Sequence, residues 1–284
     1  MGKASKVKGE LIDAVLMVDL LQTLKDIADN KLFTLLNQKD RFRRFGETFV
    51  EFFRMISLTK VKHLLISNSN PVVGIVVVTI EGSFLGQFNN RAVRRAIEEK
   101  EKHKQVRFIA VGNKSVDQLT PHDSKLKVFS EMESKGIYET AIAVKDYLVD
   151  EVKHDRMGKV LIVYSWLKTL ETQKPRVLKL LPCDELVTKQ SQFSYEYEKI
   201  IEESDPMAVI GSLSNLWITT RLFQILMDTI IASAAAQANF LDDSVDKMKK
   251  EKQKTQMKFR KARKSDIDKG LRETFSARMM TIKS

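Results

Sequence analysis

Two stretches of the chain repeat apolar residues at spacings of three and four, which predicts a long helix at each end. The later stretch begins at Asp205-Pro206, a helix N-cap followed by proline at the first helical position. It contains neither glycine nor proline from Ser212 to Lys269. A helix from Pro206 to Gly270 would be roughly 95 Å long and would need a partner helix to cover its apolar side. That side is a heptad-like seam of apolar or small residues: Leu213, Leu216, Thr220, Phe223, Met227, Ile230, Ala234, Ala238, Leu241, Val245 and Met248.

The opening stretch, residues 10–59, contains no proline and only one glycine, Gly46. Leu20, Leu24 and Ile27 begin an apolar stripe that is interrupted at Lys31. The stripe then resumes as Leu35, Gln38, Phe42, Phe45, Phe49, Phe52 and Ile56, which we interpret as core packing and not as a ligand site. The pattern predicts a second helix of roughly 70 Å. We therefore expect the two chain ends to form a long antiparallel two-helix coiled coil.

Between these helices the period changes to that of an α/β domain. Val72 to Ile80 is an almost continuous β-branched run, typical of a strand buried on both faces of a parallel sheet. Further strands are predicted at 106–111, 126–129, 160–164 and 176–181, the last after a hairpin through residues 169–175, and helices at 91–104 and 138–152. This alternation predicts a mostly parallel sheet. The expected domains are 1–60 (N-terminal coiled-coil helix), 70–200 (α/β foot) and 205–284 (C-terminal coiled-coil helix).

The net charge of +11 is concentrated in one segment. Residues 247–264 hold ten lysines or arginines and one acidic residue, Glu251, which leaves about +2 for the rest of the chain. A uniformly basic nucleic-acid-binding protein would have a different distribution. The chain has no apolar run of ~18 residues, so no membrane span is expected. The single cysteine, Cys183, excludes an internal disulfide.

No motif for catalysis, a metal or a cofactor is present. The nearest match to a phosphate-binding loop, Gly112 to Ser115 (GNKS), lacks the glycine before the lysine and the upstream glycine. Ser83 is offset by one from the serine of a nucleophile elbow. Cys183 has no histidine nearby in sequence and is interpreted as a structural or incidental thiol. The histidines are not at metal-ligand spacing and are interpreted as surface residues: His63, His103, His122 and His154. We predict a non-catalytic chain with no cofactor.

At this point the sequence resembles the gamma subunit of F-type rotary ATP synthases, a diverged, F-like member. Members typically carry T-S-D-R-G-L-C-G-G-x-N after the first strand, and residues 79–89 of this chain read TIEGSFLGQFN. Thr79, Gly86 and Asn89 are kept, and Glu81 replaces an aspartate. Gly112 and Lys114 are similar to the family's V-G-x-K turn, Lys31-Leu32 to its K-L, and Met227-Asp228 with Asn239 to its A-M-D-x-A-x-x-N-A.

The resemblance covers nearly the whole chain in layout and short stretches in identity. It implies a Rossmann-like insert between the coiled-coil helices and a contact with the catalytic subunits around Thr255-Gln256, where the family has R-Q. The predicted ring-contact residues are Lys254, Thr255, Gln256, Lys258, Arg260 and Lys261. The arginine of that pair is Thr255 here, basic residues replace the glutamates that follow it, and LIDAVLMVDLL replaces the family's basic R-R-I-x-S-V opening.

The function implied by the resemblance is a non-catalytic central rotor shaft. The implied partners are three alpha-type and three beta-type subunits per shaft, with an epsilon-type subunit and a membrane rotor ring or another machine at the foot. The implied location is cytoplasmic, at the inner face of the membrane. The departures suggest an assembly that hydrolyses ATP for other work, for example motility. The alternatives are a basic coiled-coil module that binds nucleic acid and a small-molecule enzyme built on the α/β domain.

Overall fold

The computed structural model describes residues 3–55, 63–130, 136–183 and 206–282, and the side chains of α1 are described from residue 4 to residue 37. The chain forms two compact units. Unit 1 comprises Met1–Asn30 with Ala238–Ser284, and unit 2 comprises Lys31–Gln237. The two long helices, α1 (Lys3–Met55) and α6 (Pro206–Ile282), each contribute to both units. The predicted helices at the two chain ends are therefore confirmed.

Unit 2 is built on a five-stranded sheet in the order β3-β2-β1-β4-β5. The central strand β1 (Val73–Val78) pairs in parallel with β2 (Val106–Val111) and with β4 (Lys159–Leu167). At one edge β3 (Lys127–Phe129) continues the parallel pairing, while at the other edge β5 (Gln173–Leu181) runs antiparallel to β4 through the predicted hairpin. The mostly parallel sheet is thus confirmed, and its strand order is that of a Rossmann-like fold.

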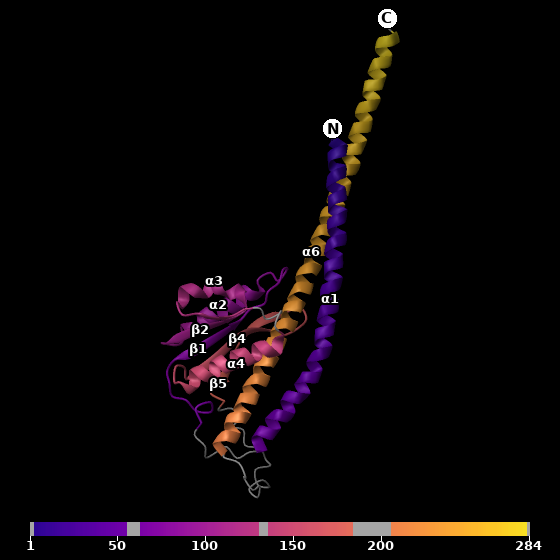
Figure 1. Ribbon diagram of the computed structural model, residues 1–284. Coiled ribbons are helices and arrows are strands. Elements are labelled where there is room, and N and C mark those ends of the chain that lie inside the picture. The colour runs from indigo at the N-terminus through magenta and orange to yellow at the C-terminus, as the bar shows by residue number, and fades with distance from the viewer. Residues whose placement is uncertain (1–2, 56–62, 131–135, 184–205, 283–284) are drawn as a thin grey trace. The chain divides into compact units, whose positions relative to one another are not determined.

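Helices cover both faces of this sheet (Figure 1). On one face, alternate strand residues such as Val76 and Ile162 pack with α4 (Ile137–Lys153) and with α6. On the other face, Ile75 and Val163 pack with α2 (Phe88–Lys100) and with Leu119 of the short helix α3 (Val116–Leu119). Every residue of β1 is buried, so the β-branched run forms the strand buried on both faces that the sequence predicts. The single turns η1 (Asn113–Ser115) and η2 (Thr120–His122) flank α3.

The part of α6 in unit 2 carries more apolar surface than the predicted seam. Ile218, Leu222 and Ile225 are each at most 1% exposed and belong to the core of the sheet. By contrast, Leu216, which the sequence places in the seam, is 47% exposed. The helix therefore serves as a layer of the α/β fold, which a single stripe could not reveal. Figure 1 shows this part of α6 alongside α4 on the same face of the sheet.

Unit 1 is an antiparallel pair of helices (Figure 1). Near one end Leu21, Leu24 and Ala28 pack with Ala238 and Leu241, and Lys25 Nζ lies 2.5 Å from Asp242 Oδ1. At the other end the Ala4 N–H donates to Asp266 Oδ2 at 3.2 Å. Residue numbers rise along one helix as they fall along the other, so the predicted antiparallel coiled coil between the chain ends is confirmed.

A heptad of buried and half-buried residues runs along both helices of unit 1, with alternate steps of three and four. In α1 these residues are Ala4, Val7, Leu11, Ala14, Val18, Leu21, Lys25 and Ala28. In α6 they are Ala238, Leu241, Val245, Met248, Lys252, Thr255, Phe259 and Ala262. Many of them are small or polar, which gives the pair a narrow seam.

The seam of α1 differs from the predicted one at two positions. Leu20 and Ile27 were expected to face the partner helix, but they are 55% and 61% exposed. Leu21 and Ala28, one position further along, face α6 in their place. The prediction was wrong because α1 carries apolar residues on two of its faces. The predicted aromatic stripe, Phe42 to Phe52 with Ile56, lies outside the residues whose side chains are described.

Beyond Asp266, α6 continues to Ile282, and its side chains at 267–278 are all exposed. Large apolar residues among them are Ile267, Leu271 and Phe275. Over the described part of the chain, no helix combines the length and the apolar character needed to cross a membrane.

Candidate functional site

The family-motif loop follows β1 and is tied to the end of β2 by Thr79. The Thr79 N–H donates to the Val111 carbonyl at 2.8 Å, and its hydroxyl lies 3.2 Å from the carbonyl oxygens of Val111 and Gly112. Gly112 has a φ of +90°, and a Cβ at this position would overlap the Thr79 carbonyl oxygen. Glycine is therefore required here on two independent grounds, the backbone angle and the space. Both residues hold the carboxyl ends of two neighbouring strands together.

Asn89 performs the same task between the loop and α2. Its Oδ1 accepts from the Ile80 N–H at 3.0 Å, and its Nδ2 donates to the Ile80 carbonyl at 2.9 Å. A carboxamide is the side chain that satisfies both backbone groups of one residue at once. Between these positions Gly86 has a φ of +53°, where glycine avoids the strain of a side chain. These motif residues thus shape and close the loop.

Glu81 occupies the position where a phosphate-binding loop would hold its anion. Its Oε1 accepts from the Asn113 N–H at 3.0 Å, and its Oε2 lies 3.6 Å from Lys114 Nζ. A carboxylate already uses the backbone donor and the lysine of the segment 112–115, and it would repel a phosphate. These two contacts hold the segment 112–115 against the family-motif loop.

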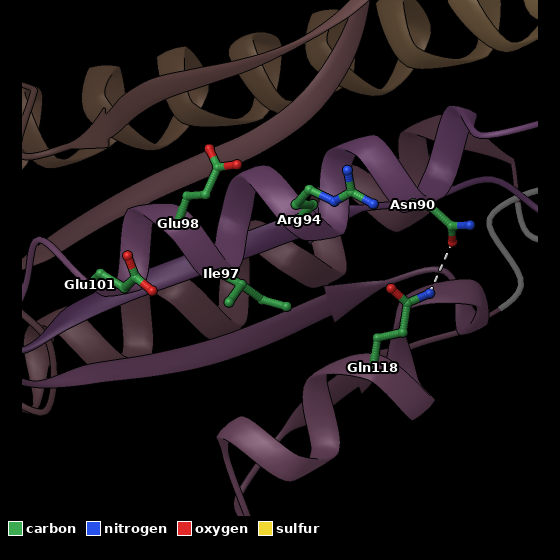
Figure 2. A pocket seen from close by; sticks show the side chains of 6 residues that line it. All are labelled: Asn90, Arg94, Ile97, Glu98, Glu101 and Gln118. Carbon is green, nitrogen blue, oxygen red and sulfur yellow. Dashed lines mark hydrogen bonds between the residues drawn. The ribbon is translucent and has the colours of Figure 1, made fainter.

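A hollow of about 380 Å³ lies between α2 and α3. Arg94, Ile97 and Glu98 line it from α2, and Glu101 lines it from the position just after that helix. Figure 2 shows Asn90 and Gln118 pointing toward one another across one end. The Gln118 Nε2 donates to Asn90 Oδ1 at 3.0 Å. The lining of the hollow combines two carboxylates and one guanidinium with a single apolar side chain, and no nucleophile is among the lining residues.

The four histidines lie in separate parts of unit 2. His63 is half-buried, and burial first, then the charge of Lys153, lowers its pKa from the usual value. Its Nδ1 accepts from the Leu65 N–H at 3.2 Å, a bond that needs the neutral ring. His122 and His154 are exposed. His103 is half-buried, with Nε2 3.6 Å from Glu99 Oε1. The expected surface position is therefore wrong for His63 and His103.

Cys183 is 1% exposed and its thiol packs 3.7 Å from the Leu180 carbonyl oxygen. In the described part of the chain, no cluster of three or more histidine, cysteine, aspartate or glutamate side chains has the arrangement of a metal site.

The predicted ring-contact residues all lie on α6 in unit 1. Lys254, Gln256, Lys258, Arg260 and Lys261 are exposed, whereas Thr255 is only 6% exposed. Thr255 belongs to the heptad positions that face α1, so direct contact with a surrounding subunit requires the pair to open there. The structure therefore puts Thr255 in the seam and leaves the other five available to a partner.

Five exposed lysines form what we call the lysine stripe: Lys247, Lys250, Lys254, Lys258 and Lys261. Their steps of three and four place them on one side of α6, centred about 130° around the helix from the seam. Lys254 Nζ lies 3.7 Å from Glu251 Oε2 in this segment. The stripe is a strong positive surface that would attract carboxylates.

Sequence reasoning missed a second exposed surface, on α1. We call it the apolar stripe: Ile12, Leu16, Leu20 and Ile27, which are 51%, 62%, 55% and 61% exposed. The sequence did contain a signal for this surface: the four residues are separated by steps of four and seven. At 100° per residue, these steps place the four side chains within an arc of about 80° on the helix. The stripe faces away from the seam, so α1 has an apolar residue set on each of two sides.

The chain as a whole is similar to proteins of one family. A model of the family described as ATP synthase matches residues 18–278. The chain is 20% identical to the ATP synthase gamma chain of Maridesulfovibrio salexigens over 86% of this chain and 87% of that protein. It is 28% identical to the gamma chain of Aliarcobacter butzleri over 74% and 73%, respectively.

Among solved structures, a chain of the Euglena gracilis mitochondrial ATP synthase (OSCP/F1/c-ring) aligns with a TM-score of 0.61 at 12% identity. That alignment covers 96% of this chain and 95% of the other. A chain of the Tetrahymena thermophila mitochondrial ATP synthase central stalk and c-ring aligns with a TM-score of 0.59 at 14% identity, covering 79% and 99%. These structures share the fold.

Proposed function

Because the chain belongs to the ATP synthase family, as a gamma chain, we propose that it is the non-catalytic central rotor shaft of an F-type or F-like rotary ATPase. The shaft comprises segments 1–60 and 205–284, and the foot is the α/β domain at 70–200. The shaft lies in the centre of a ring of three alpha-type and three beta-type nucleotide-binding subunits. It couples ATP hydrolysis or synthesis in that ring to rotation.

The observation that carries this proposal is the antiparallel helix pair of unit 1. Segments at opposite ends of the sequence keep one heptad register from Ala28 with Ala238 to Ala4 with Asp266. In this pair α6 has neither glycine nor proline from Ser212 to Lys269, so it lacks the residues at which helices usually kink. Resistance to twisting is what torque transmission requires.

Coupling in this proposal depends on contacts that differ between states of the ring. The shaft has no rotational symmetry, because one side is α1 and the other is α6. At any moment each ring subunit therefore meets a different surface, and the surface it meets stabilises one of its conformations over the others. Lys254, Gln256, Lys258, Arg260 and Lys261 supply contacts of this kind to acidic loops on the inner wall of the ring.

The foot is proposed to connect the shaft to the rest of the machine. An epsilon-type subunit and a membrane rotor ring are partners of this class, and the complex would lie at the cytoplasmic, inner face of the membrane. The departures from the family around residues 255–261 and at the start of α1 favour a specialised assembly that hydrolyses ATP. A nucleic-acid-binding role has no support beyond the basic segment, and that segment lies inside the region matched by the family model.

Purification of the native complex tests the proposal. A tag on the chain should recover two kinds of nucleotide-binding subunit at three copies each per shaft. Recovery of the chain without such subunits, or at equal stoichiometry with them, would contradict it. A second measurement neutralises Lys258, Arg260 and Lys261 to glutamine in the reconstituted complex, with Lys6→Gln on α1 as the control. The triple variant should lower the ATPase rate or the stalling torque, and no change in either would defeat the assignment of this segment.

A further inference from the structure

The contacts between α1 and α6 are concentrated at one end of unit 1, which we call the fastened end (residues 18–30 and 238–248). Leu241 is 1% exposed there and belongs to a cluster of buried apolar side chains. Beside this cluster, Lys25 Nζ lies 2.5 Å from Asp242 Oδ1, and the hydrogen bond with Asp242 raises the pKa of Lys25. Apolar burial and a charged pair therefore hold the two helices together at this end.

The seam changes character at the other end, which we call the loose end (residues 4–14 and 252–262). Lys252 and Thr255 occupy two of the four α6 seam positions there. In the antiparallel register, Lys252 lies at the level of Ala14, so a lysine faces a methyl group. A polar residue in a seam lowers the stability of a coiled coil, and an alanine offers little apolar area in return. The loose end is therefore held by less apolar burial than the fastened end.

Positive charge is crowded at the loose end. Four exposed cations flank a single level of the seam, occupied by Val7 and Phe259: Lys6 and Lys8 on α1, and Lys258 and Arg260 on α6. Like charges brought together across a helix pair repel one another. The first turn of α1 contains no acidic residue that would interact favourably with the helix dipole. Electrostatic forces therefore favour separation of the two helices here.

Few other contacts keep the loose end closed. Among the described residues, no hydrogen bond or ion pair joins α1 to α6 between the Ala4 contact with Asp266 and the ion pair of the fastened end. The Ala4 contact uses a backbone N–H of the first helical turn, a group that water can also satisfy. Gly9 lies in this part of α1, and an interior glycine weakens a helix. A helix of so few residues is marginal by itself in water, so a segment that leaves α6 would also unfold.

We propose that the loose end opens reversibly while the fastened end stays paired. Residues 4–14 of α1 then leave α6 and lose their helical structure, and α1 remains paired from about Val18 onward. Segments with few buried apolar contacts open at the lowest free energy in a protein. Opening uncovers Thr255, which is 6% exposed in the closed pair. Salt controls how often this happens, because it screens the repulsion. The inference concerns the chain by itself and goes beyond the proposed function.

Thiol labelling of the full chain measures the opening. Thr255→Cys places a thiol in the seam of the loose end, whereas Val245→Cys places one in the fastened end, where Val245 is 1% exposed. Gln256→Cys is the exposed reference for the reactivity of a free thiol. The unchanged chain gives the background from Cys183, which is 1% exposed. Each chain reacts with a neutral maleimide at 0.05 M and 0.5 M KCl, and each rate is divided by that of Gln256→Cys at the same salt concentration.

The two seam positions should differ in rate and in salt dependence. At the lower salt concentration, Thr255→Cys should react at least about tenfold faster than Val245→Cys. The higher salt concentration should slow Thr255→Cys about threefold and leave Val245→Cys unchanged. Equal rates for the two positions would overturn the inference, because the two ends would then open together or not at all.

A charge reversal tests the cause of the opening. Adding Lys6→Glu and Lys8→Glu to Thr255→Cys should slow labelling about tenfold at the lower salt concentration, because two carboxylates replace two of the repelling cations. The matched control, Lys168→Glu with Lys174→Glu, makes the same change in net charge at two exposed positions of unit 2 and should leave the rate unchanged. An unchanged rate in the chain with Lys6→Glu and Lys8→Glu would overturn the inference. Every measurement uses the chain without its ring, so this failure would leave the proposed function intact.

Discussion

Asn89 offers a sharp test of how the motif loop is held. Replacing it by aspartate keeps the size and the acceptor but removes the donor that bonds the Ile80 carbonyl at 2.9 Å. Ile80 is 3% exposed, so its carbonyl has no easy access to water. The new carboxylate oxygen would also lie close to that carbonyl oxygen, and both carry negative charge.

The loss can be estimated from these contacts. A buried polar group without its partner costs about 1–3 kcal/mol, and the repulsion adds to this, whereas the half-buried position of Asn89 limits it. We expect the free energy of unfolding to fall by about 2–3 kcal/mol. For a unit of this size, that lowers the melting temperature by about 5–10 °C.

The matched control is Asn90→Asp, one residue along the same helical turn. Asn90 is exposed, and its Nδ2 donates to Gln87 Oε1 at 3.0 Å. An acidic residue in the first turn of a helix is favourable, so this change should be within about 0.5 kcal/mol of neutral. Near-ultraviolet circular dichroism during heating measures both variants. Near pH 4 the defect of Asn89→Asp should shrink, because a protonated carboxyl group can donate to the carbonyl. Equal shifts for the two variants would refute the role assigned to Asn89.

The remaining predictions concern the two units separately. Gly112→Ala should destabilise unit 2 by about 3 kcal/mol, because the new Cβ would overlap a backbone carbonyl at a positive φ. Gly9→Ala should instead stabilise α1 by about 0.5–1 kcal/mol, because a Cβ there would meet no atom within 4 Å. Urea denaturation measures both free energies of unfolding, and a milder effect at Gly112 would contradict the strain argument. Leu241 is 1% exposed, so Leu241→Ala should lower the free energy of unfolding of unit 1 by about 2–4 kcal/mol. Leu271 is 53% exposed, so Leu271→Ala should lower it by only about 0.5 kcal/mol. Urea denaturation measures both variants, and equal losses would show that Leu241 is not part of a buried seam. The pKa of His63 is lower in the folded chain than in the unfolded one, so the unfolded state takes up a proton first as the pH falls. The free energy of unfolding should therefore decrease below about pH 6.5. This decrease should be smaller in His63→Gln, and the same pH profile for both chains would contradict the lowered pKa of His63.

The sequence was most informative where one residue type dominated a whole element. The β-branched run at 72–80 predicted a central strand, and β1 is buried at every position. The long gap without glycine or proline predicted an uninterrupted α6. In both cases local propensity and burial point to the same structure, so no tertiary knowledge was needed.

The sequence misled where a helix has more than one apolar face. Leu20, Leu24 and Ile27 fit a single stripe by spacing, yet Leu24 faces α6 while Leu20 and Ile27 face outward. The same ambiguity hid Ile218 and Leu222, which pack on the sheet. Periodicity states that a face is apolar, but which partner covers it depends on the tertiary arrangement.

The candidate site shows a similar division. The motif identified Thr79 and Asn89 as positions of interest, but their hydrogen bonds to Gly112 and Ile80 depend on how the loop approaches the strand ends. Thr255 was placed by counting along a motif, and counting gives no helix face. Its burial follows from the heptad register with α1, which only the paired structure reveals.

The central claim is that the helix pair turns inside its ring while ATP is hydrolysed. The most direct measurement attaches a bead to the foot of a surface-held complex, through an exposed position of the β4–β5 hairpin, and follows it by light microscopy. The account predicts rotation in one direction, driven by ATP, with as many steps per turn as the ring has catalytic sites. A bead that stays still while the same complexes hydrolyse ATP would contradict it.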